Sequence, residues 1–177
     1  MKFSIKSAVY LLAPSLMAVG QTKALTYQAC GPDSASFSVR MAPSEPSLAI
    51  PPSSGARVVL FAEDVNGLQG CWLLSRIGVD GRWIGAVCMQ SYVSAEIEPG
   101  PHRLCADLQQ RRGLQHTALY SFIAESDKVY YFRTEILGGQ FNVHLTALND
   151  AEGRLLLSTR SQSVASQRPV NSVLKKH

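Results

Sequence analysis

The sequence predicts an all-β fold, an antiparallel β-sandwich of immunoglobulin or transthyretin type with about seven to nine short strands and one short C-terminal helix. Three observations support this prediction. Short runs of alternating apolar residues recur at a spacing of about ten residues, turn residues separate them, and only one late stretch has a helical pattern. The rhythm is clearest in residues 77–108, which indicate a fold class but no chemistry.

Residues 1–24 have the pattern of a secretory signal peptide. Lys2 and Lys6 precede an apolar stretch, and small residues offer cleavage after Gly20 or Ala24. The apolar stretch is too short for an ordinary transmembrane helix, and no later stretch replaces it. We therefore expect a periplasmic or secreted protein without a membrane span.

The net charge of +4 does not indicate a nucleic-acid partner. Cleavage after Ala24 would remove three lysines and leave 14 basic residues against 13 acidic ones, and residues 25–165 hold 11 against 13. The part that folds is therefore close to neutral. Its charge favours neither nucleic acid nor an anionic surface as a partner.

The roughly 150 residues that follow the signal peptide suit one domain. Residues 25–56 are predicted to be an N-terminal extension, with a weak strand and then a crossing rich in proline and serine. Residues 57–158 are predicted to form the β-sandwich domain. Residues 159–177 are predicted to be a disordered tail, because the periodicity ends near Ser161.

The expected strands occupy residues 36–40, 57–62, 71–79, 83–89, 92–98, 104–108, 118–124, 128–136 and 141–148. The best hairpin joins 71–79 to 83–89, because Asp80-Gly81 suits a two-residue turn with positive φ. A second hairpin is expected between 118–124 and 128–136. A short helix through Leu157 follows, with Asn149 or Asp150 as its cap.

Four cysteines in an exported chain favour two disulfides. The hairpin register places Cys71 one diagonal step from Cys88, and a bulge near Gln90 would bring the pair into bonding range. Cys105 points away from the core face, toward a segment laid over the outside, and the segment of Cys30 is the obvious candidate. The favoured pairing is Cys30–Cys105 with Cys71–Cys88, and the other two connectivities stay open.

Trp72, Arg76 and Trp83 form a candidate binding face. Arg76 and Trp83 are diagonal neighbours in the predicted register, close enough to stack. If this face is open, it is an aromatic platform for an envelope protein, a peptide or a glycan. The alternative is that the N-terminal segment covers it as a second buried face, which the outward direction of Cys105 favours.

No catalytic residue, cofactor site or metal site is predicted. The cysteines lack the paired spacing of a zinc or thioredoxin-like site, and serine-nucleophile, metalloprotease and phosphate-loop motifs are absent from the sequence. Glu96 and Glu98 are expected to be solvated edge charges, and His102 to brace a turn. The remaining histidines, which show no convergence in the sequence, are His116, His144 and His177.

Three runs resemble the bacterial family catalogued as domain of unknown function 2846 and the related PEGA-type modules. They are Arg-Ile-Gly-Val-Asp-Gly-Arg-Trp-Ile-Gly (76–85), Glu-Pro-Gly-Pro-His-Arg-Leu-Cys-Ala (98–106) and Lys-Val-Tyr-Tyr-Phe-Arg (128–133). The resemblance covers about residues 57–158. It implies an exported β-sandwich without an established enzymatic role and without catalytic residues to carry over. Cys71 and Cys88 depart from the pattern of that family.

These observations predict an exported, non-enzymatic domain with a binding or structural role in the cell envelope. Two other classes stay open. A secreted hydrolase-type enzyme with dispersed site residues would need a pocket that gathers a histidine with a carboxylate. A secreted inhibitor or effector would also suit a domain held by disulfides.

Overall fold

The computed structural model describes residues 30–64, 70–110, 116–137 and 141–168. The predicted signal peptide and the last residues of the predicted tail, 169–177, lie outside these ranges. The strands are β1 (Ser36–Ala42), β2 (Ala56–Asp64), β3 (Gly70–Val79), β4 (Arg82–Met89), β5 (Ser91–Ile97), β6 (Gly100–Leu108), β7 (Thr117–Ala124), β8 (Lys128–Leu137), β9 (Asn142–Leu148) and β10 (Ser161–Arg168). A 3-10 helix, η1 (Pro46–Ala49), and an α-helix, α2 (Asp150–Thr159), complete the described elements.

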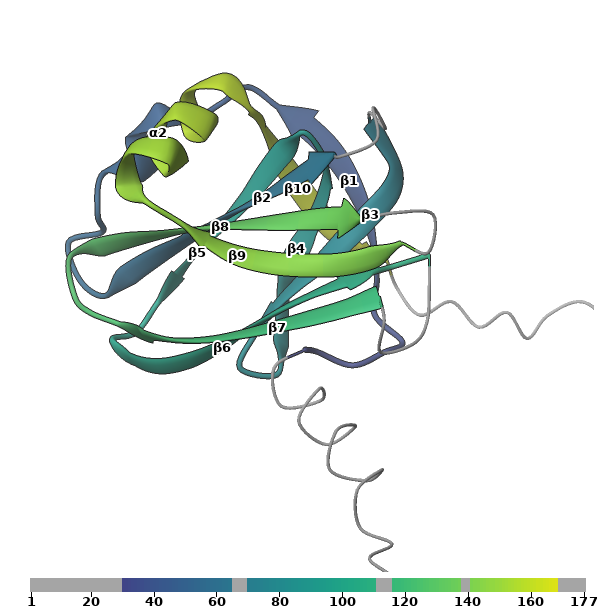
Figure 1. The fold of residues 1–177 in the computed structure, drawn as a ribbon, viewed down its shortest axis with the longest axis horizontal. Coiled ribbons are helices and arrows are strands. Elements are labelled where there is room, and N and C mark those ends of the chain that lie inside the picture. Colours follow the sequence, from purple (N-terminus) through teal and green to yellow (C-terminus); the bar gives the residue numbers. More distant parts are fainter. Residues whose placement is uncertain (1–29, 65–69, 111–115, 138–140, 169–177) are drawn as a thin grey trace, which may run out of the picture.

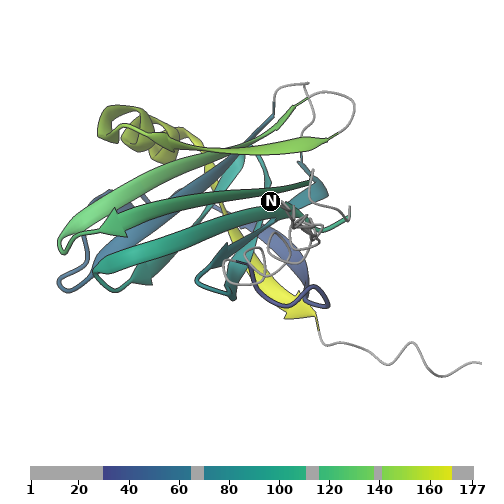
Figure 2. The ribbon, with the colours of Figure 1, turned by 60° about the horizontal axis from the view of Figure 1, so that its bottom comes forward.

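Two sheets face each other across an apolar core, which confirms the predicted sandwich-like all-β class. The larger sheet has the order β1-β10-β5-β2-β8-β9, and the smaller one has the order β4-β3-β6-β7 (Figure 1). Figure 2 shows the strands as stacked layers with α2 outside them. The core between the sheets gathers apolar side chains from both inner faces, among them Val58, Leu60, Ile77, Leu104 and Phe132.

The strand pairing differs from the predicted antiparallel pattern in three places, of which the short parallel pairing of β10 with β5 is one. β2 and β8 run parallel along nine residue pairs, from Ala56↔Lys128 to Asp64↔Ile136. The segments 118–124 and 128–136 do not form a hairpin, since β7 pairs with β6 in one sheet and β8 pairs with β2 in the other. The turn between them passes from one sheet to the other. A sequence pattern marks that turn but does not reveal which sheet the next strand joins.

The β3–β4 hairpin follows the predicted register only next to its turn. Val79 faces Arg82 and Gly78 faces Trp83, with Asp80 and Gly81 at positive φ as the turn requires. The register then shifts by one residue, so that Leu74, not Leu73, faces Cys88. One irregularity lies between Ile77 and Gly78, and the other between Gly70 and Leu74. The second lies opposite Cys88 and Met89, next to Gln90 as the sequence suggested, with its extra residues on β3.

A second apolar layer covers the outer face of the larger sheet. Leu157 of α2 packs against Val59, Phe61, Tyr92 and Tyr131, which lie on β2, β5 and β8. The helix approaches closely because Gly153 has no side chain, and a Cβ added there would overlap the Tyr131 ring. Asn149 accepts a hydrogen bond from the Glu152 amide at 2.9 Å, so one of the two predicted caps is confirmed.

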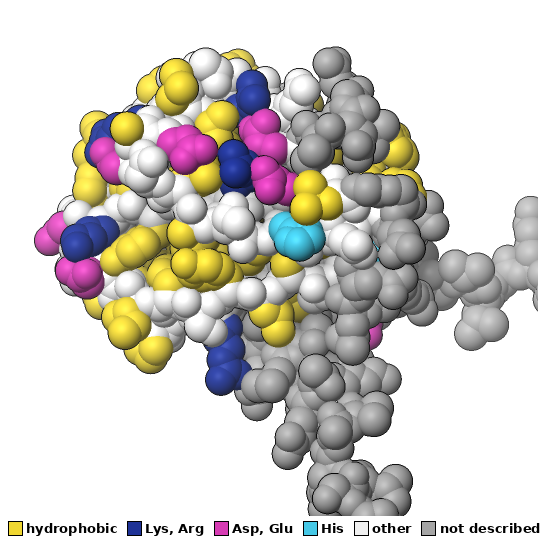
Figure 3. All heavy atoms as spheres, viewed as in Figure 1, with side chains coloured by type: hydrophobic (Ala, Val, Ile, Leu, Met, Phe, Trp, Pro, Cys, Tyr) yellow, Lys and Arg dark blue, Asp and Glu magenta, His cyan; other side chains and the backbone are white. Residues whose placement is uncertain are grey.

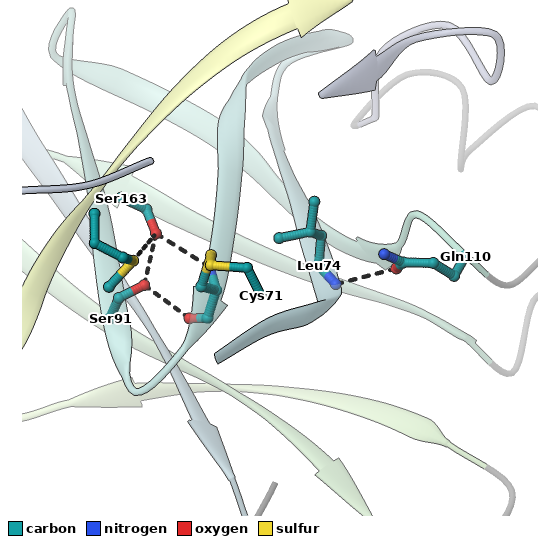
Figure 4. The surroundings of a disulfide bond; sticks show 7 residues. Cys71, Leu74, Ser91, Gln110 and Ser163 are labelled. Carbon is teal, nitrogen blue, oxygen red and sulfur yellow. Dashed lines mark hydrogen bonds between the residues drawn. A yellow bond between two sulfur atoms is a disulfide. The ribbon is translucent and has the colours of Figure 1, made fainter. Parts of the chain in front are cut away.

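The predicted tail is wrong for residues 161–168, which form β10. This strand pairs antiparallel with all seven residues of β1 and meets β5 at Ser161 and Gln162. The sequence of β10 has no clear apolar alternation, and polar contacts of its side chains help to hold the strand in place. The Ser163 hydroxyl lies 2.6 Å from that of Ser91 and accepts a hydrogen bond from the Cys88 amide (Figure 4). β10 is therefore a tenth strand, which the expected seven to nine did not include.

The two sheets are held differently along their two sides. On one side the β1–β10 pair packs over β4 through Phe37, Ala86 and Ala165. On the other side β7 and β9 are edge strands of different sheets. Apolar side chains are visible in the band between these two edges (Figure 3), and Tyr120, Phe122 and Leu145 are partly buried there against the core.

Candidate functional site

Residues 30–35, which we call the strap, cross the outer face of the smaller sheet. Cys30 is bonded to Cys105 of β6, and both residues are buried. The Trp83 indole N–H donates to the Pro32 carbonyl at 2.9 Å. Gly31 lies against the same ring, and a Cβ there would fall 2.6 Å from Trp83 Cγ. The strap therefore covers this face, as the second of the two sequence interpretations required.

Arg76 is the centre of the covered face. Its guanidinium forms a bidentate pair with Asp107, at 2.7 and 2.8 Å, and donates to the Asp33 and Ala35 carbonyl oxygens at 3.1 and 2.7 Å. It also stacks on Trp83, with its central carbon 4.5 Å from the ring centroid. Only 6% of Arg76 is exposed. A buried guanidinium is stable here because hydrogen-bond acceptors replace the water that it loses.

The predicted face is therefore not one open platform. Arg76 and Trp83 stack as expected, but the strap buries the arginine and half-buries the tryptophan. Trp72 is 53% exposed and lies within the irregular part of β3 between Gly70 and Leu74. The structure brings two of the three residues together beneath the strap.

The two disulfides follow the favoured pairing. Cys71 of β3 is bonded to Cys88 of β4, in addition to the bond between Cys30 and Cys105. The Cys71–Cys88 bridge lies beside the polar contacts of Ser91 and Ser163, where β4 leads into β5 (Figure 4). Two disulfides fit an oxidising compartment.

A cleft of about 340 Å³ opens at one end of the sandwich, between the β3–β4 turn, the start of β2 and the β5–β6 turn. We call it the end cleft. Its lining combines apolar side chains of the core with a ring of charged groups, and consists of Ser54, Gly55, Val79, Asp80, Arg82, Ile84, Glu96, Ile97, Glu98 and His102. Its volume lies at the small end of the range that ligand pockets occupy.

His102 braces the two turns that form the end cleft. Its Nδ1 lies 2.6 Å from Asp80 Oδ2, and its Nε2 lies 2.7 Å from the Glu98 carbonyl oxygen. Asp80 Oδ1 also accepts a hydrogen bond from the Arg103 amide at 2.8 Å. The expected turn-bracing role of His102 thus extends to two turns. Both ring nitrogens are in contact with oxygen atoms of the two turns, so neither is free to deprotonate a nucleophile.

Two charged side chains of the end cleft, Arg82 and Glu98, were not predicted from the sequence to form a site. Glu96 is paired with Arg57 at 2.7 Å, whereas no residue that the structure describes pairs with Glu98 or Arg82. Both are exposed. The available signal was their position next to turns. Arg82 follows the β3–β4 hairpin turn, and Glu98 precedes the β5–β6 turn, which passes from one sheet to the other.

The other candidate residues lie apart from the end cleft. His116 is buried, with Nδ1 3.0 Å from the Phe141 carbonyl oxygen, and His144 is exposed on β9. His177 lies outside the described ranges. Within those ranges no group of three or more histidine, cysteine or acidic side chains is placed to hold a metal ion.

Two buried tyrosines of the helix-covered layer have raised pKa values. Desolvation raises the pKa of Tyr92, although its hydroxyl oxygen accepts a hydrogen bond from the Glu45 amide at 2.7 Å. Desolvation also raises the pKa of Tyr131, whose hydroxyl has no hydrogen-bond partner among the described residues. The same layer therefore holds one satisfied hydroxyl and one unsatisfied hydroxyl.

The comparisons with known proteins add no name to this arrangement. No protein-family model, curated protein or solved structure matches the chain. Neither helix within the described ranges has the length and apolarity needed to cross a membrane. The site must therefore be interpreted from its own geometry.

Proposed function

We propose that this chain is an exported, non-enzymatic domain of immunoglobulin or transthyretin type that binds a ligand in the cell envelope, and that the end cleft is its binding site. The proposal places the protein in the periplasm or outside the cell. The observation that carries it is the construction of the cleft. Its walls are braced by His102 and by the Arg57–Glu96 pair, while two charged groups, Arg82 and Glu98, have no partner among the described residues. Preformed walls reduce the ordering that a ligand must impose.

The resemblance to the domain of unknown function 2846 family supports the same class of function, because it implies an exported β-sandwich without catalytic residues. Two disulfides and the expected signal peptide also support export. The partners that suit such a domain are an envelope protein, a peptide or a glycan.

The hydrolase alternative has one observation in its favour, because the end cleft holds a histidine beside a carboxylate. A general base, however, needs a nitrogen within reach of the group that it deprotonates. In His102 the nitrogen opposite Asp80 is bonded to the Glu98 carbonyl oxygen. This arrangement supports a bracing role over a catalytic one.

A matched pair of variants tests the proposed site. Ser54 lines the end cleft, whereas its neighbour Ser53 does not, and both are exposed. The purified mature protein is screened by thermal shift against amino acids, short peptides and oligosaccharides. We expect at least one compound that stabilises the wild type and the Ser53→Trp variant but not Ser54→Trp, whose indole would fill the cleft. Ligands that stabilise all three proteins equally, or no ligand at all, would contradict the proposal.

A further inference from the structure

The charged groups of the end cleft are only partly neutralised. Five of its lining residues carry or can carry charge, and two of them, Asp80 and His102, are bonded to each other at 2.6 Å. A third, Glu96, is paired with Arg57, which lies on the neighbouring strand. Glu98 and Arg82 are left, and no ion pair joins them to each other or to another described residue. The cleft therefore offers one free carboxylate and one free guanidinium.

The remaining lining is suited to an uncharged carbon skeleton. Val79 is 5% exposed, and Ile84 and Ile97 are partly buried against the core between the sheets. Side chains held by core packing keep their positions when a ligand arrives. These side chains form the apolar part of a lining whose charged groups, Glu98 and Arg82, are exposed to solvent.

We infer that the end cleft binds a small zwitterion, an amino acid or a short peptide, whose ammonium group pairs with Glu98 and whose carboxylate pairs with Arg82. A guanidinium fits a carboxylate with two parallel hydrogen bonds, and a carboxylate accepts from an ammonium. This inference rests on the proposed binding function and specifies its ligand class.

Ligands with a single type of charge fit less well. A dianion would leave Glu98 unpaired and bring more negative charge near Asp80 and Glu96. A dication would meet the Arg82 guanidinium and leave it without an anionic partner. Only a ligand with both charges satisfies both free groups, and an unsatisfied charged group in a closed complex costs affinity.

The experiment measures binding of the mature protein to a series of zwitterions by isothermal titration calorimetry. The probes are glycine, γ-aminobutyrate, ε-aminocaproate and diglycine, with butylamine and butyrate as analogues that carry one charge. We expect the affinity to peak at one spacing between the charges, and both single-charge analogues to bind at least about tenfold more weakly than the best zwitterion, since each loses a charged hydrogen bond.

Charge variants assign the two ends of the ligand. Glu98→Gln and Arg82→Gln should each weaken the best zwitterion by about tenfold or more. The double variant Glu98→Arg/Arg82→Glu, which exchanges the two charges, should recover part of the affinity because the ligand can bind in the opposite direction. The controls are Glu45→Gln and Arg40→Gln, two exposed charges that do not line the cleft and should leave binding unchanged.

The possible results separate this inference from the proposed function. If a compound binds in a manner that Ser54→Trp abolishes, but a single-charge analogue binds as tightly or the Gln variants bind normally, the zwitterion inference is wrong and the binding site stands. If Ser54→Trp leaves the binding of every compound unchanged, the proposed site is wrong and the zwitterion inference fails with it. A spacing optimum together with recovery in the charge-exchanged variant supports both.

Discussion

Arg76 and Arg82 lie on the two strands of one hairpin, yet their surroundings are opposite. Arg76 is buried beneath the strap with its donors satisfied by Asp107 and two carbonyl oxygens. Arg82 lines the end cleft and has no partner among the described residues. The arginine with the richer contacts therefore belongs to the framework, whereas Arg82 keeps donors that no described residue uses.

The largest expected difference between the two regions is in stability. Arg76→Ala would remove the arginine donors from the Asp107 carboxylate and from two carbonyl oxygens beneath the strap, and should lower the free energy of unfolding by about 3–5 kcal/mol. Arg82→Ala breaks no described pair and should change it by less than about 0.5 kcal/mol. Urea unfolding of the oxidised proteins measures both. Equal effects would show that the framework and the cleft are not distinct.

The two disulfides should also differ in their contributions. Cys30–Cys105 closes a loop with a sequence separation of 75 and Cys71–Cys88 one of 17, so the chain-entropy model assigns about 4 and about 3 kcal/mol to them. The paired alanine variants, Cys30→Ala/Cys105→Ala and Cys71→Ala/Cys88→Ala, are compared by urea unfolding.

Tryptophan fluorescence adds a local test of the strap. In a Trp72→Phe background only Trp83 emits. Loss of the Cys30–Cys105 bond should expose Trp83 and shift its emission to longer wavelength, whereas loss of Cys71–Cys88 should not. If both paired variants give the same spectrum, the bond from Cys30 does not hold the strap on Trp83.

Two tyrosines sharpen the contrast between satisfied and unsatisfied polar groups. Tyr92→Phe removes the acceptor of the Glu45 amide and should cost about 1 kcal/mol, whereas Tyr131→Phe removes a buried hydroxyl without a described partner and should be neutral or stabilising. Thermal or urea unfolding at neutral pH measures the pair. A loss for Tyr131→Phe as large as that for Tyr92→Phe would indicate a partner for the Tyr131 hydroxyl.

The same tyrosines predict how stability changes with pH. Burial raises the pKa of both groups in the folded state above the ordinary value of about 10. The contribution that these two tyrosines make to the free energy of unfolding is therefore fully present below pH 10. It is lost as the pH rises through their raised folded-state pKa values. Tyr131→Phe should reduce this alkaline loss in a series of unfolding curves from neutral to alkaline pH. An unchanged slope would contradict the raised pKa of Tyr131.

The smallest expected stability effects belong to the end cleft itself. Glu98→Gln and Arg82→Gln should stay within about 0.5 kcal/mol of the wild type, because neither side chain has a described partner. His102→Phe should cost more, since it leaves the Asp80 carboxylate and the Glu98 carbonyl oxygen without the ring donors. Thermal unfolding orders the three variants. A stability loss for Glu98→Gln that matches His102→Phe would place Glu98 in the framework.

The sequence predicted what local patterns and local turns determine. The Asp80-Gly81 turn, the nine strands with apolar alternation, the Asn149 cap and both disulfides are set by neighbouring residues or by the direction of one side chain. β10 was missed because Ser163 and a long ladder to β1 specify it, and neither leaves an apolar period. The parallel pairing of β2 and β8 was missed because the residues of a strand and of its adjacent turns do not determine which sheet the strand joins.

The candidate site was harder to predict than the fold. Stacking of Arg76 on Trp83 was predicted, but the sequence left open whether the N-terminal segment covers it, since both interpretations use the same hairpin. The end cleft depends on His102, Asp80 and the Glu98 carbonyl oxygen meeting from three different turns and strands. These three groups meet because of the order in which the strands pair within the two sheets. Short sequence motifs do not determine that order.

The β1–β10 ladder also constrains the order of events during folding. Ser36 is paired with Arg168, so the β1–β10 ladder cannot form in full until nearly all of the described chain has been synthesised. Contacts between such distant residues are slow to form because a long loop must close first. The nearby cysteines Cys71 and Cys88 are then positioned to pair first, and the strap to be fixed later.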